Sequence, residues 1–125
     1  MIKEVAFVAI AVSDKERARK FYQETLELKP ARTQMEGAWV EYDFGPTTIG
    51  VGCHPAWRPS RDGTTVAFEV DDIDATIEKL KSRGVTFDIP KTETPVCWMA
   101  IIKDPDGNNI VIHKLKPENE KGPCV

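Results

Sequence analysis

The strongest constraint on the fold of this chain is that its sequence carries one pattern twice. Residues 9–14 (AIAVSD) match residues 67–72 (AFEVDD), and each segment alternates like a strand before a residue that can cap a helix. In the first copy Ser13 precedes Glu16 by three residues, the spacing of a capping box. Apolar residues then recur at the helical period in both copies, at Ala18, Phe21, Tyr22 and Leu26 and at Ile73, Ile77 and Leu80. Each half therefore predicts a strand followed by a helix.

Three shorter strands follow the helix in each half, which makes each half a βαβββ module. The predicted strands are residues 31–35, 38–44 and 47–53, and then residues 85–89, 96–103 and 108–115. Residues 54–63, rich in Pro and Arg, link a first module of about residues 4–53 to a second of about residues 64–115. We therefore predict an α+β fold in which two tandem βαβββ modules form a curled mixed sheet around a central cleft, with the helices outside. The alternative is a ferredoxin-like sandwich, which needs one strand fewer per half.

Length and composition limit the number of domains and the kinds of partner. The length of 125 residues is typical of one domain, which we expect over residues 1–115. Residues 116–125 lack periodicity and are expected to be a disordered tail. The net charge of −3, with both signs scattered, argues against nucleic-acid binding. No apolar run approaches the roughly 20 residues of a membrane helix, so no membrane partner is expected. Three cysteines without CxxC spacing (Cys53, Cys97 and Cys124) and the lack of a signal-peptide pattern favour the cytoplasm.

Three motifs in the right order resemble those of the vicinal oxygen chelate superfamily, which includes glyoxalases, bleomycin resistance proteins and extradiol dioxygenases. Residues 9–14 with Phe21-Tyr22 resemble its first strand and helix, and residues 66–74 (VAFEVDDID) resemble its fifth strand and second helix. Residues 103–108 (KDPDGN) resemble its closing hairpin. The resemblance covers residues from about 4 to 115 and implies the same fold, usually as a homodimer.

The resemblance also implies where metal ligands would stand. Metal-dependent members carry His or Glu ligands on the first, fourth, fifth and eighth strands, and those positions match Phe7, Gly50, Thr65 and Val111 here. Divalent cations need oxygen, nitrogen or sulfur donors, which Phe, Gly and Val do not have, and a Thr hydroxyl is a weak one. We therefore expect neither a metal nor another cofactor, as in the metal-free bleomycin-resistance branch.

Strand alternation predicts which side chains line the cleft. If the turn at residues 104–107 pairs Lys103 near Asn108, then Ala100 lies opposite Val111 and Trp98 opposite His113, so that Trp98 faces the cleft. The small residues of the predicted cleft are Ala9, Ala11, Gly50, Gly52, Ala67 and Ala100. The predicted ligand-binding residues are Phe7, Trp39, Glu41, Gly50, Thr65, Glu69, Trp98, Val111 and His113. Aromatic faces and carboxylates suit a planar, positively charged organic ligand.

The sequence is compatible with four functions. The first is a binding protein that sequesters such a small molecule without catalysis. The second is a glyoxalase- or dioxygenase-like enzyme in which His54, His113 and either Glu69 or Glu41 form a non-standard metal site. The third is a metal-free enzyme with Glu69 or Glu41 as general base, and the fourth is a partner-binding domain. Trp39 and Trp98 could also be filler for a lost metal site, and Trp57 in the linker a lid or interface residue.

Overall fold

The computed structural model describes residues 1 and 3–123, and Cys124 lies outside this part. The chain divides into two compact units. The N-terminal unit consists of residues 1–61 together with the turn Pro105–Gly107. The C-terminal unit consists of residues 62–104 and the chain from Asn108 onward.

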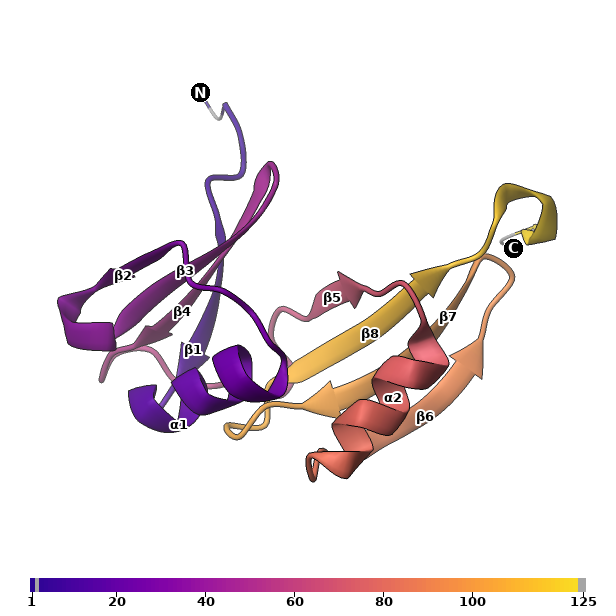
Figure 1. Ribbon diagram of the computed structural model, residues 1–125. Helices are drawn as coiled ribbons and strands as arrows, with labels where there is room; N and C mark the ends of the chain where they lie inside the picture. Colours follow the sequence, from indigo (N-terminus) through magenta and orange to yellow (C-terminus); the bar gives the residue numbers. More distant parts are fainter. Residues whose placement is uncertain (2, 124–125) are drawn as a thin grey trace. The chain divides into compact units, whose positions relative to one another are not determined.

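The N-terminal unit is one βαβββ module (Figure 1). Its elements are β1 (Val8–Val12), α1 (Lys15–Arg19), the π-helical segment η1 (Lys20–Thr25), β2 (Arg32–Gln34), the short helix η2 (Met35–Gly37), β3 (Trp39–Phe44) and β4 (Thr47–Cys53). The sheet order is β1-β4-β3-β2, with β1 parallel to β4 and the other pairs antiparallel. The helix and η1 cover one face of this sheet, where Tyr22 packs beside Tyr42 at a ring-centroid distance of 6.3 Å.

The C-terminal unit repeats this topology. Its elements are β5 (Val66–Glu69), α2 (Ile73–Ser82), β6 (Phe87–Glu93), β7 (Cys97–Lys103), β8 (Asn109–Leu115) and the short helix η3 (Glu118–Glu120). The sheet order is β5-β8-β7-β6, again with one parallel pair, β5 and β8. The buried core under α2 includes Ala100, Ile102, Ile110 and Ile112. The predicted α+β fold of two tandem βαβββ modules is therefore confirmed.

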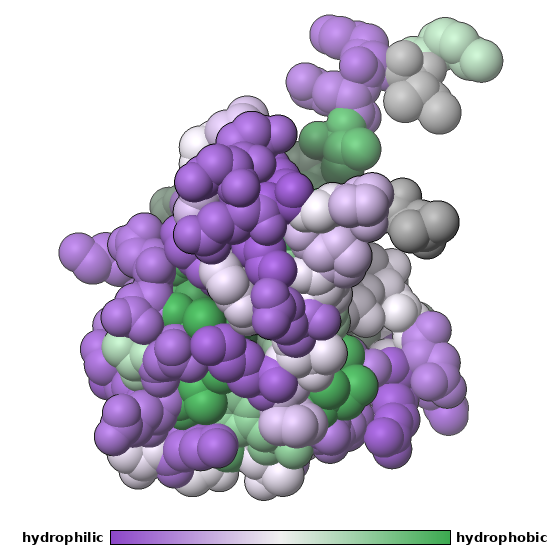
Figure 2. Space-filling view, turned by 90° about the vertical axis from the view of Figure 1, so that its right-hand side faces the viewer, coloured by the Kyte–Doolittle hydropathy of each residue, from purple (hydrophilic) through white to green (hydrophobic). Residues whose placement is uncertain are grey.

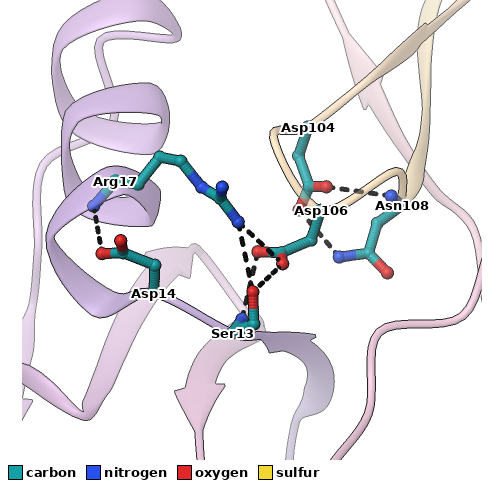
Figure 3. Close-up of polar contacts among 6 residues, drawn as sticks. All are labelled: Ser13, Asp14, Arg17, Asp104, Asp106 and Asn108. Carbon is teal, nitrogen blue, oxygen red and sulfur yellow. Dashed lines mark hydrogen bonds and ion pairs between the residues drawn. The ribbon is translucent and has the colours of Figure 1, made fainter.

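The first helix begins one residue later than predicted. Asp14, rather than Ser13, is its N-cap, and the Asp14 carboxylate accepts a hydrogen bond of 3.0 Å from the Arg17 N–H. The Ser13 N–H and hydroxyl donate instead to the carboxylate of Asp106, which also accepts from the Arg17 guanidinium at 3.0 Å (Figure 3). Asp106 belongs to the turn that is part of the N-terminal unit, and its side chain is only 5% exposed. The DPDGN motif therefore supplies a carboxylate to the N-terminal end of α1, where an anion is stabilised.

The predicted register of β7 and β8 is wrong by one residue. Asp104 N–H donates to the Asn108 carbonyl, and the Asp104 carboxylate accepts from the Asn108 backbone and side-chain N–H groups (Figure 3). Because these two residues close the turn, the first strand pair is Lys103 with Asn109 rather than with Asn108. A shift of one residue moves every side chain of a strand to the other face relative to its partner. Trp98 therefore lies opposite Lys114, and Met99 lies opposite His113.

The segment beyond β8 continues alongside the C-terminal unit. The Lys116 N–H donates to the Val96 carbonyl at 2.9 Å, and the Gly122 N–H donates to the Pro95 carbonyl at 2.8 Å. The disorder expected over residues 116–125 stays a prediction, which amide hydrogen exchange can check.

Hydrophilic residues predominate on the face of the molecule shown in Figure 2, with smaller apolar areas between them. Phe7 and Trp57 are among the large apolar side chains that stay exposed, at 45% and 43%. No helix among the described residues has the length and apolar character to cross a membrane.

Candidate functional site

Three aromatic side chains gather on the face of the N-terminal sheet that α1 leaves uncovered. Trp39 is only 9% exposed, and the rings of Phe7 and Trp57 meet its ring edge to face at centroid distances of 5.2 and 5.8 Å. We call Phe7, Trp39 and Trp57 the Trp39 cluster. Edge-to-face contacts between aromatic rings are favourable because the positive edge of one ring meets the negative face of another. Trp39 is therefore a buried support, whereas its two neighbours present aromatic surface to the outside.

Two glycines of β4 make this arrangement possible. Trp39 pairs with Gly52 across β3 and β4, and its ring extends over Gly50. A Cβ atom at Gly50 would lie 2.2 Å from Trp39 Cη2, and one at Gly52 would lie 2.6 Å from Trp57 Cζ3. Neither distance is physically possible for carbon atoms without a shift of the rings. The indole of Trp39 therefore occupies the space into which a side chain at position 50 would project.

A strip of charged residues continues the same face. The Trp39 indole N–H donates to Glu41 Oε2 at 2.7 Å, and Arg32 Nε donates to Glu41 Oε1 at 2.7 Å. The Arg32 guanidinium also binds both oxygens of Asp43, at 2.7 and 3.1 Å, and the Thr48 hydroxyl donates to Asp43. Two carboxylates and one guanidinium leave the strip with one net negative charge.

These contacts perturb the ionisation of the strip. The Trp39 hydrogen bond, and then the one from Arg32, lower the pKa of Glu41. Hydrogen bonds from Arg32 and Thr48 lower the pKa of Asp43, and the two carboxylates raise the pKa of Arg32. A carboxylate with a lowered pKa is a weaker base, so the geometry disfavours Glu41 as a general base near neutral pH.

The equivalent face of the C-terminal unit carries a carboxylate and an imidazole. His113 Nδ1 lies 2.6 Å from Glu69 Oε1, and the Leu115 N–H donates to Glu69 Oε2 at 2.8 Å. Partial burial is the largest single influence on Glu69 and raises its pKa, but the hydrogen bonds from Leu115 and His113 together bring that pKa below its ordinary value. Glu69 is therefore an ionised hydrogen-bond acceptor rather than a general base.

The positions at which relatives hold a metal do not fit one here. Phe7, Gly50 and Val111 have no donor atom, Thr65 lies just before β5, and Trp39 fills the space above Gly50. Within residues 1 and 3–123, no three side chains of His, Cys, Asp or Glu are grouped to hold a metal ion. The His54 ring is engaged in its own turn, where Nδ1 accepts from the Ala56 N–H at 3.0 Å. The donor set thus does not match the divalent cation of metal-dependent members of the vicinal oxygen chelate superfamily.

The structure distributes the predicted ligand-binding residues over three surfaces. Phe7, Trp39, Glu41 and Gly50 come together in the N-terminal unit. Glu69, Val111 and His113 share one face of the C-terminal unit, as alternation predicts.

Trp98 lies on the opposite face of that same sheet, which also carries the buried Ala100. The ammonium groups of Lys91 and Lys116 lie 5.8 and 5.2 Å from the centre of its ring. The predicted placement of Trp98 beside His113 is therefore wrong, because β7 and β8 pair one residue away from the predicted register.

Sequence reasoning missed two members of the N-terminal site and one neighbour of His113. Trp57 lies in the linker, where the sequence predicts a lid or interface residue, although the Gly50-Val51-Gly52 sequence signals that bulky groups approach β4 closely. Arg32 could have been found from its place opposite Glu41 in an alternating strand pair. Met99 was missed because of the one-residue error in register.

Comparison with known proteins agrees with this fold. The sequence profile described as the Glyoxalase/Bleomycin resistance protein/Dioxygenase superfamily matches residues 4–112. The chain belongs to this superfamily, which confirms the resemblance drawn from the three motifs. The crystal structure of TnmS3, an antibiotic binding protein from Streptomyces sp. CB03234, superposes with a TM-score of 0.76 at 30% identity, over 92% of this chain and 98% of that one.

Two sequence relatives have names that concern biosynthesis and enzymatic activity. The anthracycline biosynthesis protein DauV of Streptomyces sp. (strain C5) is 31% identical over 90% of this chain, which spans only 42% of DauV. The lactoylglutathione lyase of Haemophilus influenzae is 28% identical over 86% of this chain and 89% of the lyase. The similar proteins thus include an antibiotic binding protein and a lyase, so similarity alone does not distinguish a binding protein from an enzyme.

Proposed function

We propose that the protein binds a planar organic molecule against the Trp39 cluster and sequesters it unchanged, without a metal or cofactor. The observation that carries the proposal is the pair of half-exposed rings, Phe7 and Trp57, held edge-on by the buried Trp39. Removing exposed aromatic rings from water is favourable. A flat ligand that covers Phe7 and Trp57 would therefore gain binding free energy from burying them. Phe7 and Trp57 are 45% and 43% exposed, and both contact Trp39, so a ligand can stack on two aromatic side chains that Trp39 holds in place.

The charged strip beside the cluster sets the polar part of the recognition. Arg32 already offsets one of the two carboxylates, Glu41 and Asp43, so the strip has one negative charge to offer. A cationic group on the ligand therefore gains a modest, screened attraction, and stacking on the aromatic rings supplies most of the affinity.

The relatives support this class of function. TnmS3, at 30% identity over nearly its whole length, is an antibiotic binding protein. The similarity to a lactoylglutathione lyase favours an enzyme as the second candidate. Against that candidate stand the absence of donor atoms at Phe7, Gly50 and Val111 and the lowered pKa values of Glu41 and Glu69.

We further propose a single domain over residues 1–115 that acts as a homodimer in the cytoplasm. Each four-stranded sheet has two edge strands, which are β1 and β2 in the N-terminal unit and β5 and β6 in the C-terminal unit. Unpaired edges favour association with another chain. Light scattering of the purified protein should give twice the mass of the 14.0 kDa chain, and a monomer would contradict the dimer.

The binding proposal is tested with acridine and N-methylacridinium, which have nearly the same planar shape and differ in charge. Both should quench tryptophan fluorescence saturably, and Trp57→Ala and Phe7→Ala should each weaken binding. Saturable binding that neither substitution affects would rule out the Trp39 cluster as the site.

The metal-free part of the proposal is tested by elemental analysis. After dialysis against a chelator and back into zinc, nickel, manganese or iron(II), the protein should retain far less than one equivalent. One tightly held equivalent, together with lyase activity, would favour the enzymatic candidate instead.

A further inference from the structure

The C-terminal unit contains a polar pair that the proposed function does not use. Glu69 at the end of β5 and His113 on β8 are direct neighbours across the parallel strand pair, and their side chains meet at 2.6 Å. The second oxygen of Glu69 is held by the Leu115 N–H at 2.8 Å. The carboxylate therefore has a fixed orientation toward the imidazole.

This arrangement fixes the tautomer of His113. An ionised carboxylate can only accept hydrogen bonds, so the proton between the two groups belongs to His113 Nδ1. In the neutral ring, Nε2 then carries a lone pair and is a hydrogen-bond acceptor. None of the residues that the structure describes occupies Nε2 with a hydrogen bond, and the His113 side chain is 27% exposed.

The surroundings of His113 are apolar on the same face of the sheet. Met99 lies directly opposite His113, Val111 precedes it by two residues, and Ala67 pairs with Val111. Met99 and Val111 are half-buried, so part of their surface is accessible beside the imidazole. Glu69 is the charged group that faces His113 from the neighbouring strand; Lys114, on the same strand, points to the other face, opposite Trp98.

We propose that this face of the C-terminal unit binds a phenol-type hydroxyl, with His113 Nε2 as the acceptor and Glu69 as the residue that positions it. The hydroxyl proton moves from the phenol oxygen toward Nε2, which forms an imidazolium next to the Glu69 carboxylate and leaves the negative charge on the phenolate oxygen. The positive ring lies between two negative oxygens, so no net charge is created. Met99 and Val111 contact the apolar ring of the ligand. The site goes beyond the proposed function because it lies in the other unit and uses none of the Trp39 cluster.

The probe is 4-nitrophenol, whose phenolate absorbs visible light while the neutral form does not, compared with 4-nitroanisole, which has the same ring and no acidic proton. At a pH just below the pKa of the free probe, adding wild-type protein should raise the phenolate absorbance saturably. His113→Gln should weaken binding by about tenfold or more, the value of a hydrogen bond to a charged group, and remove the absorbance change. Glu69→Gln should reduce that change while binding persists.

A matched control is available because the chain has only two histidines, His54 and His113. His54→Gln should leave the absorbance change intact, and it also assigns the imidazole signals in ¹⁵N NMR spectra. The free protein should show His113 with its proton on Nδ1, and 4-nitrophenol should perturb Nε2. A proton on Nε2 in the free protein, equal binding of 4-nitroanisole, or no saturable response to 4-nitrophenol would each overturn the proposal. The acridine titration tests binding at Trp57 through tryptophan fluorescence, and the 4-nitrophenol titration tests binding at His113 through phenolate absorbance. The failure of one proposal is therefore distinguishable from the failure of the other.

Discussion

The two modules share a backbone and differ in what they place on it. Ala11 pairs with Gly52 in the first module, and Glu69 pairs with His113 at the equivalent positions of the second. One strand further, Trp39 pairs with Gly52 and Met99 pairs with His113. The first module thus puts a large ring over small residues, and the second puts a thioether beside a carboxylate–imidazole pair.

This comparison separates what determines the fold from what determines the site. Both sheets have the same order and the same single parallel pair, although their exposed faces have few side chains in common. Apolar alternation on the helix-covered face and the turns between strands are sufficient for the topology. The opposite face is then free to vary, and that face carries the Trp39 cluster in one unit and the Glu69–His113 pair in the other.

The largest effect is expected when one residue is transferred from the second module to the first. Gly50 and Val111 occupy equivalent positions, opposite Ala9 and Ala67. Gly50→Val should destabilise the protein by about 3 kcal/mol, at the upper end for overpacked sites, because its Cβ would lie 2.2 Å from the Trp39 ring. Urea unfolding measures the change.

The control for this prediction is a double-mutant cycle with Trp39→Ala. If the indole is what Gly50→Val collides with, the double variant should be more stable than the sum of the two single changes predicts, by about 1 kcal/mol or more. Additive effects would mean that the glycine is needed for another reason than the ring above it.

Much of the fold followed from local patterns in the sequence. The repeat and the alternating apolar residues predicted both βαβββ modules, and alternation placed Phe7, Trp39 and Glu41 on one face and Glu69 and His113 on another. Such patterns repeat every two residues, so they give the face of a side chain without any knowledge of its partners.

The errors came from contacts that local patterns do not contain. The β7–β8 register depended on Asp104 closing the turn onto Asn108, a hydrogen bond that the sequence motif does not specify. Ser13 failed as a helix cap because Asp106, distant in sequence, binds it instead. Trp57 was missed because a loop residue has no periodic position from which its contact could be inferred.

A second difference between the modules concerns their tryptophans. Trp57 is exposed beside Trp39, whereas Trp98 lies on the helix-covered side of its sheet under two lysine side chains. Trp57→Ala should weaken acridine binding by more than about 1 kcal/mol, the scale of a lost stacking contact, and change stability little. Trp98→Ala should leave the affinity unchanged. Fluorescence titration and urea unfolding of both variants check this, and a loss of affinity in Trp98→Ala alone would reverse the assignment of the site.

The two modules also differ in charge. The first places the Arg32 guanidinium between two carboxylates, and the second places the His113 imidazole beside one. Changing these charges should have a smaller effect than the substitutions above. Because Arg32 offsets one of the two carboxylates, Glu41→Gln should reduce the preference for N-methylacridinium over acridine, and Arg32→Gln should increase it. Each change should be small, since the strip is exposed to solvent and screened by salt. The ratio of the two dissociation constants, measured for each variant at low and at high salt, isolates this term from stacking, which both probes share. The two substitutions must act in opposite directions for the charge argument to hold; a shift of the same sign in both would mean that they act by releasing the Trp39 indole, which Glu41 orients at 2.7 Å.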